Sequence, residues 1–112
     1  MSRRRLPEIT HLQFLVLGTL RGEERLGRSI RRSLARHGVS RTGPAFYQMM
    51  ARLEDAGLVA GEYDQKIVDR QIIKERRYTL TPAGDAAWTS TRAFYSDAIG
   101  EYGSLKPRTS HA

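Results

Sequence analysis

The sequence predicts a mainly α-helical domain that carries one small β-hairpin. Four segments place apolar residues at helical spacing between helix-start and helix-stop signals. Between the third and the fourth of them, the chain becomes rich in β-branched and aromatic residues, which favour strands. A length of 112 residues suits one domain with a modest core and is short for two.

The first helix is expected from about Thr10 to Arg21. Thr10 suits the N-cap position, and Gln13 stands three residues later, where the partner of a capping box belongs. The segment "ITHLQFLVLGTL" leaves almost no polar face, so this helix is predicted to be buried on most sides. In a domain this small, it should be a central element that a partner subunit also covers.

The second helix is expected from about Leu26 to His37, after a polar loop and before Gly38. Ile30 and Leu34 give it a narrow apolar stripe, while arginines cover most of the remaining surface. It should therefore dock through one side and present a cationic outer face.

The third helix is predicted within "TGPAFYQMMARLEDAGLV", residues 42–59, with Pro44 at its first position and Gly57 just beyond its end. Helical spacing predicts a buried stripe of Phe46, Met49, Met50, Leu53 and Ala56. The remaining faces are free for another partner and carry Tyr47, Gln48, Ala51, Arg52 and Asp55.

A long antiparallel hairpin is predicted after the third helix. The segments "LVAGEYDQKIVD" and "QIIKERRYTLT" have strand composition, and a two-residue turn at Asp69 and Arg70 would join them. This turn places Ile67 opposite Ile72. Arg70 is not the glycine that such a turn prefers.

The last helix is predicted to begin at Thr81 as N-cap, followed by Pro82, and to run to about Tyr102. Spacings of three, four, three and four residues, typical of a coiled-coil-like contact, relate Trp88, Thr91, Tyr95, Ala98 and Tyr102. The chain is thus expected to divide into a basic arm (1–9), a folded domain (10–80), a dimerisation helix (81–102) and a polar tail (103–112).

The net charge is +7, and the whole excess lies in residues 1–41, which hold ten Lys and Arg against three Asp and Glu. Residues 42–112 hold nine of each sign. A positive field of this kind attracts polyanions, nucleic acid first and anionic lipid second. The alternative is a basic surface that only keeps the protein soluble.

Several functional classes find no support in the sequence. No apolar run approaches the ~20 residues that cross a bilayer, and no secretory signal is recognisable, so a cytoplasmic protein is expected. Cysteine is absent, and the histidines lie too far apart to suggest a metal site. Without a nucleophile elbow, a phosphate loop or paired carboxylates, we expect neither catalysis nor a bound cofactor.

Three helices, a basic hairpin and a long helix follow the order of a winged helix-turn-helix domain, whose third helix lies in the DNA major groove. The chain resembles the PadR family of bacterial transcriptional regulators over about residues 10–95, through "HLQFLVLGTL", "GPAFYQMMARLEDAGLV" and "ERRYTLTPAG". The resemblance implies a homodimer, usually a repressor, paired through the first and last helices. We therefore expect sequence-specific binding to a pseudo-palindromic operator in double-stranded DNA.

The candidate DNA-binding residues fall on three segments. The start of the third helix offers backbone N–H groups and side chains to phosphates and bases, through Arg41, Thr42, Gly43, Pro44, Tyr47, Gln48 and Arg52. The wing offers Lys66, Arg70, Lys74 and Arg77, and the N-terminal arm offers Arg3, Arg4 and Arg5. Two alternatives stay open: Tyr47 can complete the packing against the second helix, and Arg76 and Arg77 can pair with Glu62 or Glu75.

The dimer interface is expected on the first and last helices, at Leu12, Leu15, Val16, Trp88, Thr91, Phe94, Tyr95, Ala98 and Tyr102. The aromatic residues among them can instead line a pocket for a small-molecule effector, which the sequence does not identify. The rival function is a winged-helix protein-interaction module without specific DNA binding, in which the last helix and the isoleucine-bearing wing dock a partner.

Overall fold

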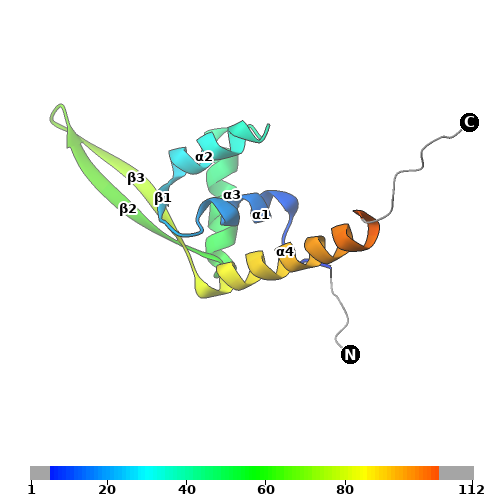
Figure 1. The fold of residues 1–112 in the computed structure, drawn as a ribbon. Helices are drawn as coiled ribbons and strands as arrows, with labels where there is room; N and C mark the ends of the chain where they lie inside the picture. Colours follow the sequence, from blue (N-terminus) through cyan, green and yellow to red (C-terminus); the bar gives the residue numbers. More distant parts are fainter. Residues whose placement is uncertain (1–5, 104–112) are drawn as a thin grey trace, which may run out of the picture.

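The computed structural model describes residues 6–103, which form four helices and a three-stranded antiparallel sheet. In chain order they are α1 (His11–Thr19), β1 (Arg25–Leu26), α2 (Gly27–Arg36), α3 (Gly43–Asp55), β2 (Val59–Val68), β3 (Gln71–Leu80) and α4 (Pro82–Gly103). The predicted order of three helices, a hairpin and a long helix is confirmed. The hairpin projects from the helices as a wing, and α4 runs past their opposite side (Figure 1).

The predictions for the chain ends lie mostly outside the described residues. These comprise the arm with Arg3, Arg4 and Arg5 and the tail beyond residue 103. Within residues 6–103, no helix has both the length and the apolar character that a membrane crossing requires.

α1 begins with the predicted capping box. The Gln13 N–H donates to the Thr10 hydroxyl at 3.0 Å, and the Thr10 N–H donates to the Gln13 side-chain oxygen at 2.9 Å. The helix stops at Thr19, two residues before the predicted end. Leu20 caps it, and Gly22 at φ 90° then turns the chain into a left-handed conformation that ends helical geometry.

One hydrophobic core joins the first three helices to the sheet, and it consists of Val16, Leu17, Leu20, Ile30, Leu34, Phe46, Met50, Leu53, Val59 and Tyr78. The central position of α1 and the narrow stripe of α2 are confirmed. The prediction that Ala56 joins the stripe of α3 is wrong, because the helix ends at Asp55 and Ala56 becomes its exposed C-cap.

The short strand β1 lies where the predicted polar loop meets the predicted start of the second helix at Leu26, and the sequence predicts no strand there. Its two residues pair with β3, Arg25 opposite Tyr78 and Leu26 opposite Arg77. The strand order is therefore β1-β3-β2, with β3 in the centre. Two residues carry too little periodicity to be distinguished from a loop in the sequence, and the pairing partner is about fifty positions away.

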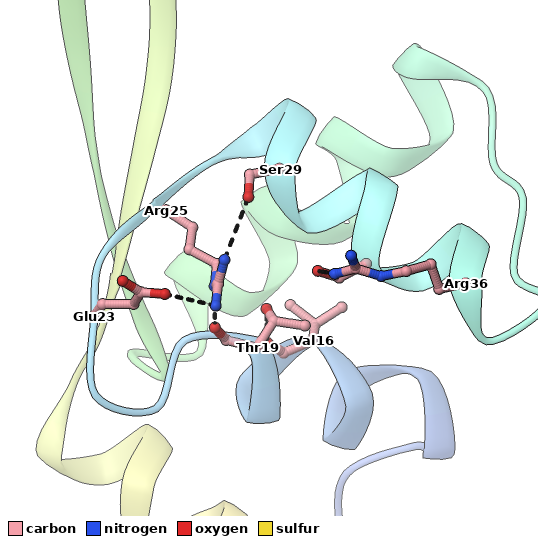
Figure 2. A network of polar contacts seen from close by, with 7 residues as sticks. Val16, Thr19, Glu23, Arg25, Ser29 and Arg36 are labelled. Carbon is pink, nitrogen blue, oxygen red and sulfur yellow. Dashed lines mark hydrogen bonds and ion pairs between the residues drawn. The ribbon is translucent and has the colours of Figure 1, made fainter.

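The side chain of Arg25 connects α1 to α2 (Figure 2). Its Nε donates to the carbonyl of Thr19 at 2.5 Å, and its Nη1 donates to the hydroxyl of Ser29 at 3.4 Å. Glu23 pairs with the same guanidinium at 2.6 Å. One arginine thus satisfies a carbonyl at the end of α1 and orients the start of α2, which positions the helices around α3.

The hairpin has the predicted register, with Ile67 opposite Ile72. Asp69 and Arg70 form the two-residue turn, with φ angles of 50° and 65°. Two left-handed residues in sequence are characteristic of a type I′ turn, whose twist matches that of the strands. The turn therefore forms although Arg70 is not glycine.

α4 is attached to the end of α3 through its N-cap. The hydroxyl of Thr81 accepts the N–H of Gly84 at 3.0 Å and donates to the carbonyl of Gly57 at 2.6 Å. A Cβ on Gly84 would collide with the carbonyl of Leu58, so glycine permits this close approach. The predicted start of the last helix is confirmed.

Candidate nucleic-acid interface

The first turns of α3 leave polar groups free at the surface. Thr42 is the N-cap, and its hydroxyl accepts the N–H of Ala45 at 3.3 Å. Gln48 and Arg52 are exposed, and neither side chain has a bonding partner among residues 6–103. The helix therefore presents an amide and a guanidinium on the side that faces away from the core.

Tyr47 packs against the start of α2 and also keeps exposed surface. Its ring stands edge-on to Phe46 with the centroids 5.0 Å apart, and a Cβ added to Gly27 would lie 2.7 Å from its hydroxyl oxygen. Gly27 therefore lets the start of α2 approach this tyrosine closely. Tyr47 nevertheless keeps 40% of its surface exposed, so it packs and remains available to a ligand.

A cationic cavity of about 290 Å³ lies between α2 and the loop that precedes α3. Four arginines help to line it: Arg28, Arg31, Arg32 and Arg41. Arg31 donates to the carbonyl of Arg41 at 2.9 Å and so holds the loop that enters α3. The guanidinium groups of Arg32 and Arg41 have no acidic partner in the described part of the chain.

Arg31 and Arg32 are additions to the candidates derived from the sequence, where they appear only as part of a cationic helix face. The signal that could have found them is their spacing with Arg28, at i, i+3 and i+4 on α2. That spacing predicts one cluster of charge, but the closeness of the cluster to Arg41 comes only from the fold.

Two of the four wing candidates already have acidic partners. Arg77 binds Asp64 at 2.7 Å and Glu24 at 3.6 Å, and Lys66 lies 3.7 Å from Glu75. The hydrogen bond from Arg77 is the main reason why the pKa of Asp64 is lowered.

The other two wing candidates, Arg70 at the turn and Lys74 on β3, have no acidic partner within residues 6–103. They are therefore the wing cations best placed to neutralise a phosphate. Glu75, next to Lys74 in sequence, is already engaged, because Arg28 from α2 lies 3.1 Å from it.

Arg76 ties the wing to α3, since its Nη2 lies 2.5 Å from Oε1 of Glu54. Burial alone would lower the pKa of Arg76, but the hydrogen bond and charge of Glu54 outweigh it and raise the pKa. Of the alternatives left open, the pairing of Arg76 and Arg77 with acidic side chains is observed, but the partners are Glu54 for Arg76 and Asp64 and Glu24 for Arg77 rather than Glu62 or Glu75. In the observed register, Arg76 and Tyr63 share the face that turns toward α3, whereas Glu62 and Glu75 lie on the opposite face.

Two of the residues predicted at a dimer interface are buried in their own chain. Val16 lies in the core without exposed surface, and Thr91 is buried with its hydroxyl donating to the carbonyl of Ala87 at 2.7 Å. Both predictions are wrong, because neither side chain reaches a surface that a partner can contact. Leu12 and Leu15 are half-buried against the same core.

Trp88 also packs mainly within its own chain. Its ring stacks on Phe14 with the centroids 5.5 Å apart, and the guanidinium carbon of Arg21 lies 3.8 Å from the ring centre. Phe94 and Ala98 are half-buried. These contacts fix α4 against α1.

An exposed apolar stripe remains on α4 at i, i+4 and i+7, formed by Tyr95, Ile99 and Tyr102. Tyr95 also lies 3.2 Å from the Nε2 of His11 through its hydroxyl. Ile99 is absent from the candidates derived from the sequence, because spacing counted from Trp88 selects Ala98 instead.

Solved structures of transcription regulators share this fold. A PadR family transcriptional regulator from Eggerthella lenta DSM 2243 superposes with a TM-score of 0.64 at 28% identity, covering 85% of this chain and 83% of that chain. A PadR-like transcription factor from Bacteroides fragilis superposes with a TM-score of 0.67 at 16% identity, covering 82% of this chain and 86% of that chain. BpsR of Bordetella bronchiseptica, whose DNA binding is regulated by 6-hydroxynicotinic acid, superposes with a TM-score of 0.63 at 24% identity. The match covers 89% of this chain and 70% of that chain. No protein-family model matches the sequence, and no curated protein matches it significantly.

Proposed function

We propose that this PadR-like winged-helix transcription regulator is a cytoplasmic homodimer that represses its targets by binding a pseudo-palindromic operator in double-stranded DNA. The observation that carries the proposal is the surface around α3. This helix contributes Phe46 to the four-arginine cavity and Tyr47 to a second cavity shared with the wing. Its exposed polar side is therefore flanked by cations on both sides.

The two kinds of contact that DNA recognition requires are available on this surface. Arg32, Arg41, Arg70 and Lys74 have charges that no acidic side chain in residues 6–103 neutralises, so they suit phosphates. Gln48 is exposed on α3 and can bond an adenine edge through both its amide atoms. Phosphate contacts would supply affinity, and Gln48 with Tyr47 would supply discrimination between sites.

The decisive experiment is fluorescence anisotropy with DNA from upstream of the protein's own gene and with an unrelated duplex. Between about 50 mM and about 200 mM salt, we expect the affinity to fall steeply, by about 1,000-fold if six or more phosphates are contacted. The upstream DNA should bind more tightly than the unrelated duplex at both salt concentrations. Equal, salt-insensitive affinities would contradict the proposal.

Matched variants separate affinity from specificity. Arg32→Gln and Arg41→Gln should each weaken binding to both duplexes and reduce the salt slope by about one. Gln48→Ala should weaken mainly the upstream duplex. Arg92→Gln, an exposed arginine on α4, is the control and should leave both affinities unchanged.

Homodimerisation is supported by the exposed stripe on α4, since apolar residues of this kind dominate homodimer contacts. Sedimentation velocity should show a dimer, and Ile99→Glu should convert it to a folded monomer because this side chain is exposed. Repression is tested separately: deleting the gene should raise transcription from the bound promoter. A fall in transcription would instead identify an activator.

The exposed apolar wing favours the rival function, a protein-interaction module. Ile67, Ile72 and Tyr63 are all exposed on the hairpin, and exposed apolar surface of this kind often marks a protein-interaction site. This function predicts no salt-sensitive complex with either duplex. The anisotropy experiment therefore distinguishes the two functions directly.

A further inference from the structure

The four-arginine cavity between α2 and the loop before α3 also contains one serine. This loop, residues 37–42, belongs to no helix or strand, and Ser40 within it is exposed and lines the cavity beside Arg41. The hydroxyl of Ser40 has no hydrogen-bond partner among residues 6–103. Phosphorylation of this serine would therefore place a phosphate group at the cavity without breaking an existing contact.

The neighbouring hydroxyl side chains are not equivalent to it. Ser33 on α2 is only 7% exposed, and its hydroxyl accepts a hydrogen bond from an arginine of the same helix. Ser29 is half-buried and accepts from Arg25 at 3.4 Å. Thr42 is exposed, but its hydroxyl caps α3. Among the serines and threonines of residues 27–42, all of them described, Ser40 alone is exposed, unbonded and part of the cavity lining.

The lining of the cavity has an excess of positive charge. Arg28 is paired with Glu75 at 3.1 Å. Arg31, Arg32 and Arg41 have no acidic partner within residues 6–103, and no carboxylate belongs to the lining. Arg31 is already held by the carbonyl of Arg41, so the guanidinium groups of Arg32 and Arg41 are the free ones. The cavity thus suits an anion that carries more than one negative charge.

A phosphorylated serine has the charge and the acceptors that this cavity lacks. At pH 7 it carries a charge of about −1.5 to −2 and three strong acceptor oxygens, and beside an arginine cluster it can form about one to three charge-assisted hydrogen bonds. The planar guanidinium group can bind two phosphate oxygens at once. The loop also leads into the N-terminus of α3, whose helix dipole favours a nearby anion.

We propose that Ser40 is a phosphorylation site and that its phosphate is bound by Arg32 and Arg41. A serine kinase would supply the group from a nucleoside triphosphate. The Ser40 oxygen forms a bond to the γ-phosphorus, and the bond from that phosphorus to the bridging oxygen breaks. The nucleoside diphosphate leaves, and the hydroxyl proton passes to a base of the kinase. The regulatory consequence rests on the proposed function: the phosphate occupies two arginines that would bind DNA phosphates, so phosphorylation weakens DNA binding.

The phosphate site is tested without DNA, on the full chain with phosphoserine encoded genetically at position 40. Phosphorus NMR follows the second ionisation, whose pKa is about 6 in an ordinary phosphoserine. Because nearby guanidinium groups favour the dianion, we expect this pKa to fall by about 0.5 or more. The joint change Arg32→Gln and Arg41→Gln should return it to about 6, whereas Arg92→Gln on α4 should not.

A second phosphoserine provides the matched control for this experiment. Ser90 on α4 is exposed and lines a cavity whose lining contains no arginine. Phosphoserine at position 90 should therefore titrate with the ordinary pKa. Equal pKa values at the two positions, or a lowered value at position 40 that survives the joint arginine change, would overturn the proposed phosphate site.

The effect on DNA is measured by anisotropy with the upstream and the unrelated duplex. Phosphoserine at position 40 should weaken both complexes about tenfold and reduce the salt slope by about two, one for each occupied arginine. With Arg32→Gln and Arg41→Gln already present, the same modification should weaken binding by about twofold or less. An unchanged affinity with phosphoserine at position 40 refutes the regulatory role. If the unmodified protein binds neither duplex, the proposed function fails, while the NMR result still decides whether the phosphate site exists.

The modification itself is tested with the wild type and Ser40→Ala. Each full-length protein is incubated with γ-labelled ATP and an extract of the cells that produce it, and the incorporated phosphate is measured. The wild type should be labelled, and Ser40→Ala should lose most of the label. Because Ser40 is exposed and its hydroxyl is unbonded, this change should leave the fold intact. Equal labelling of the two proteins, or no labelling of either, contradicts phosphorylation at Ser40.

Discussion

The base and the tip of the wing are stabilised in different ways. At the base, Tyr78 is only 1% exposed, lies in the core and belongs to the central strand of the sheet. At the tip, Ile67 and Ile72 are 80% and 67% exposed and face each other across a hairpin without helices beside it (Figure 1). The base is therefore part of the folded unit, and the tip is a projection from it.

The cations of the wing also differ in whether they are available to a partner. Arg76 and Arg77 are adjacent in sequence near the base, and each is bound to a carboxylate. Lys74 and Arg70 lie farther out, where no acidic side chain among residues 6–103 reaches them. Lys66 lies opposite Ile73, as far out as Lys74, but is paired with Glu75. An acidic partner on the same face of the hairpin, rather than position along it, therefore separates the paired cations from the available ones.

The largest expected effect on stability comes from shortening the buried side chain of Tyr78 at the base. Tyr78→Ala should lower the free energy of unfolding by about 3–5 kcal/mol, because it removes a buried ring and leaves a cavity. Ile72→Ala at the tip is the matched control and should cost about 0.5 kcal/mol or less. Urea unfolding followed by circular dichroism measures both. Similar losses for the two variants would show that the wing folds as one unit.

The base should also respond to alkaline pH. Burial raises the pKa of Tyr78 from 10.0 to about 12. Since the folded state holds this proton more tightly, the associated stability is complete below pH 10 and is lost as the pH rises through 12. The free energy of unfolding should fall by about 1.4 kcal/mol per pH unit in this window.

Urea titrations at pH 9, about 11 and about 12 test this dependence. Tyr78→Phe should remove the slope because it has no phenolic proton, whereas Tyr102→Phe, on an exposed residue of α4, should keep it. A slope that survives in Tyr78→Phe would assign the alkaline sensitivity to other groups.

The ion pairs at the base should contribute less to the free energy of unfolding than Tyr78 does, and the more buried pair should contribute more than the exposed one. Glu54 and Arg76 are mostly buried in their pair, so a double-mutant cycle with Glu54→Gln and Arg76→Gln should give a coupling of about 1 kcal/mol. The same cycle for Asp64 and Arg77 should give a smaller value, because both side chains are more exposed. A larger coupling for the second pair would reverse the proposed link between burial and strength.

The features that the sequence could predict depend on neighbouring residues. Thr10 and Gln13 form their capping box within one turn, and the register of Ile67 and Ile72 follows from the length of the turn between them. Both are local geometries that residue types and spacing determine. The same reasoning explains why the helix boundaries differ from prediction by only one or two residues.

The features that the sequence missed depend on segments that lie far apart in the chain. β1 forms only because β3 lies beside it, and Glu54 meets Arg76 only because the wing folds back toward α3. Periodicity likewise cannot tell whether an apolar residue faces the core or a partner, which is why Val16 was misplaced at an interface. The cavity between α3 and the wing belongs to the same class, since no single segment contains it.

The smallest expected effect concerns the turn, where stability and DNA binding should change in opposite directions. Arg70→Gly should raise the free energy of unfolding by about 0.5 kcal/mol, because glycine adopts the φ of 65° without strain. The same change removes a cation of the tip, so DNA affinity should fall and the salt slope should decrease by about one. Arg70→Asn is the control: asparagine tolerates this conformation and lacks the charge, so it should reproduce the loss of affinity with less gain in stability. If Arg70→Gly binds DNA like the wild type, the tip does not contact DNA, and its exposed isoleucines would then favour the protein-docking role of the wing.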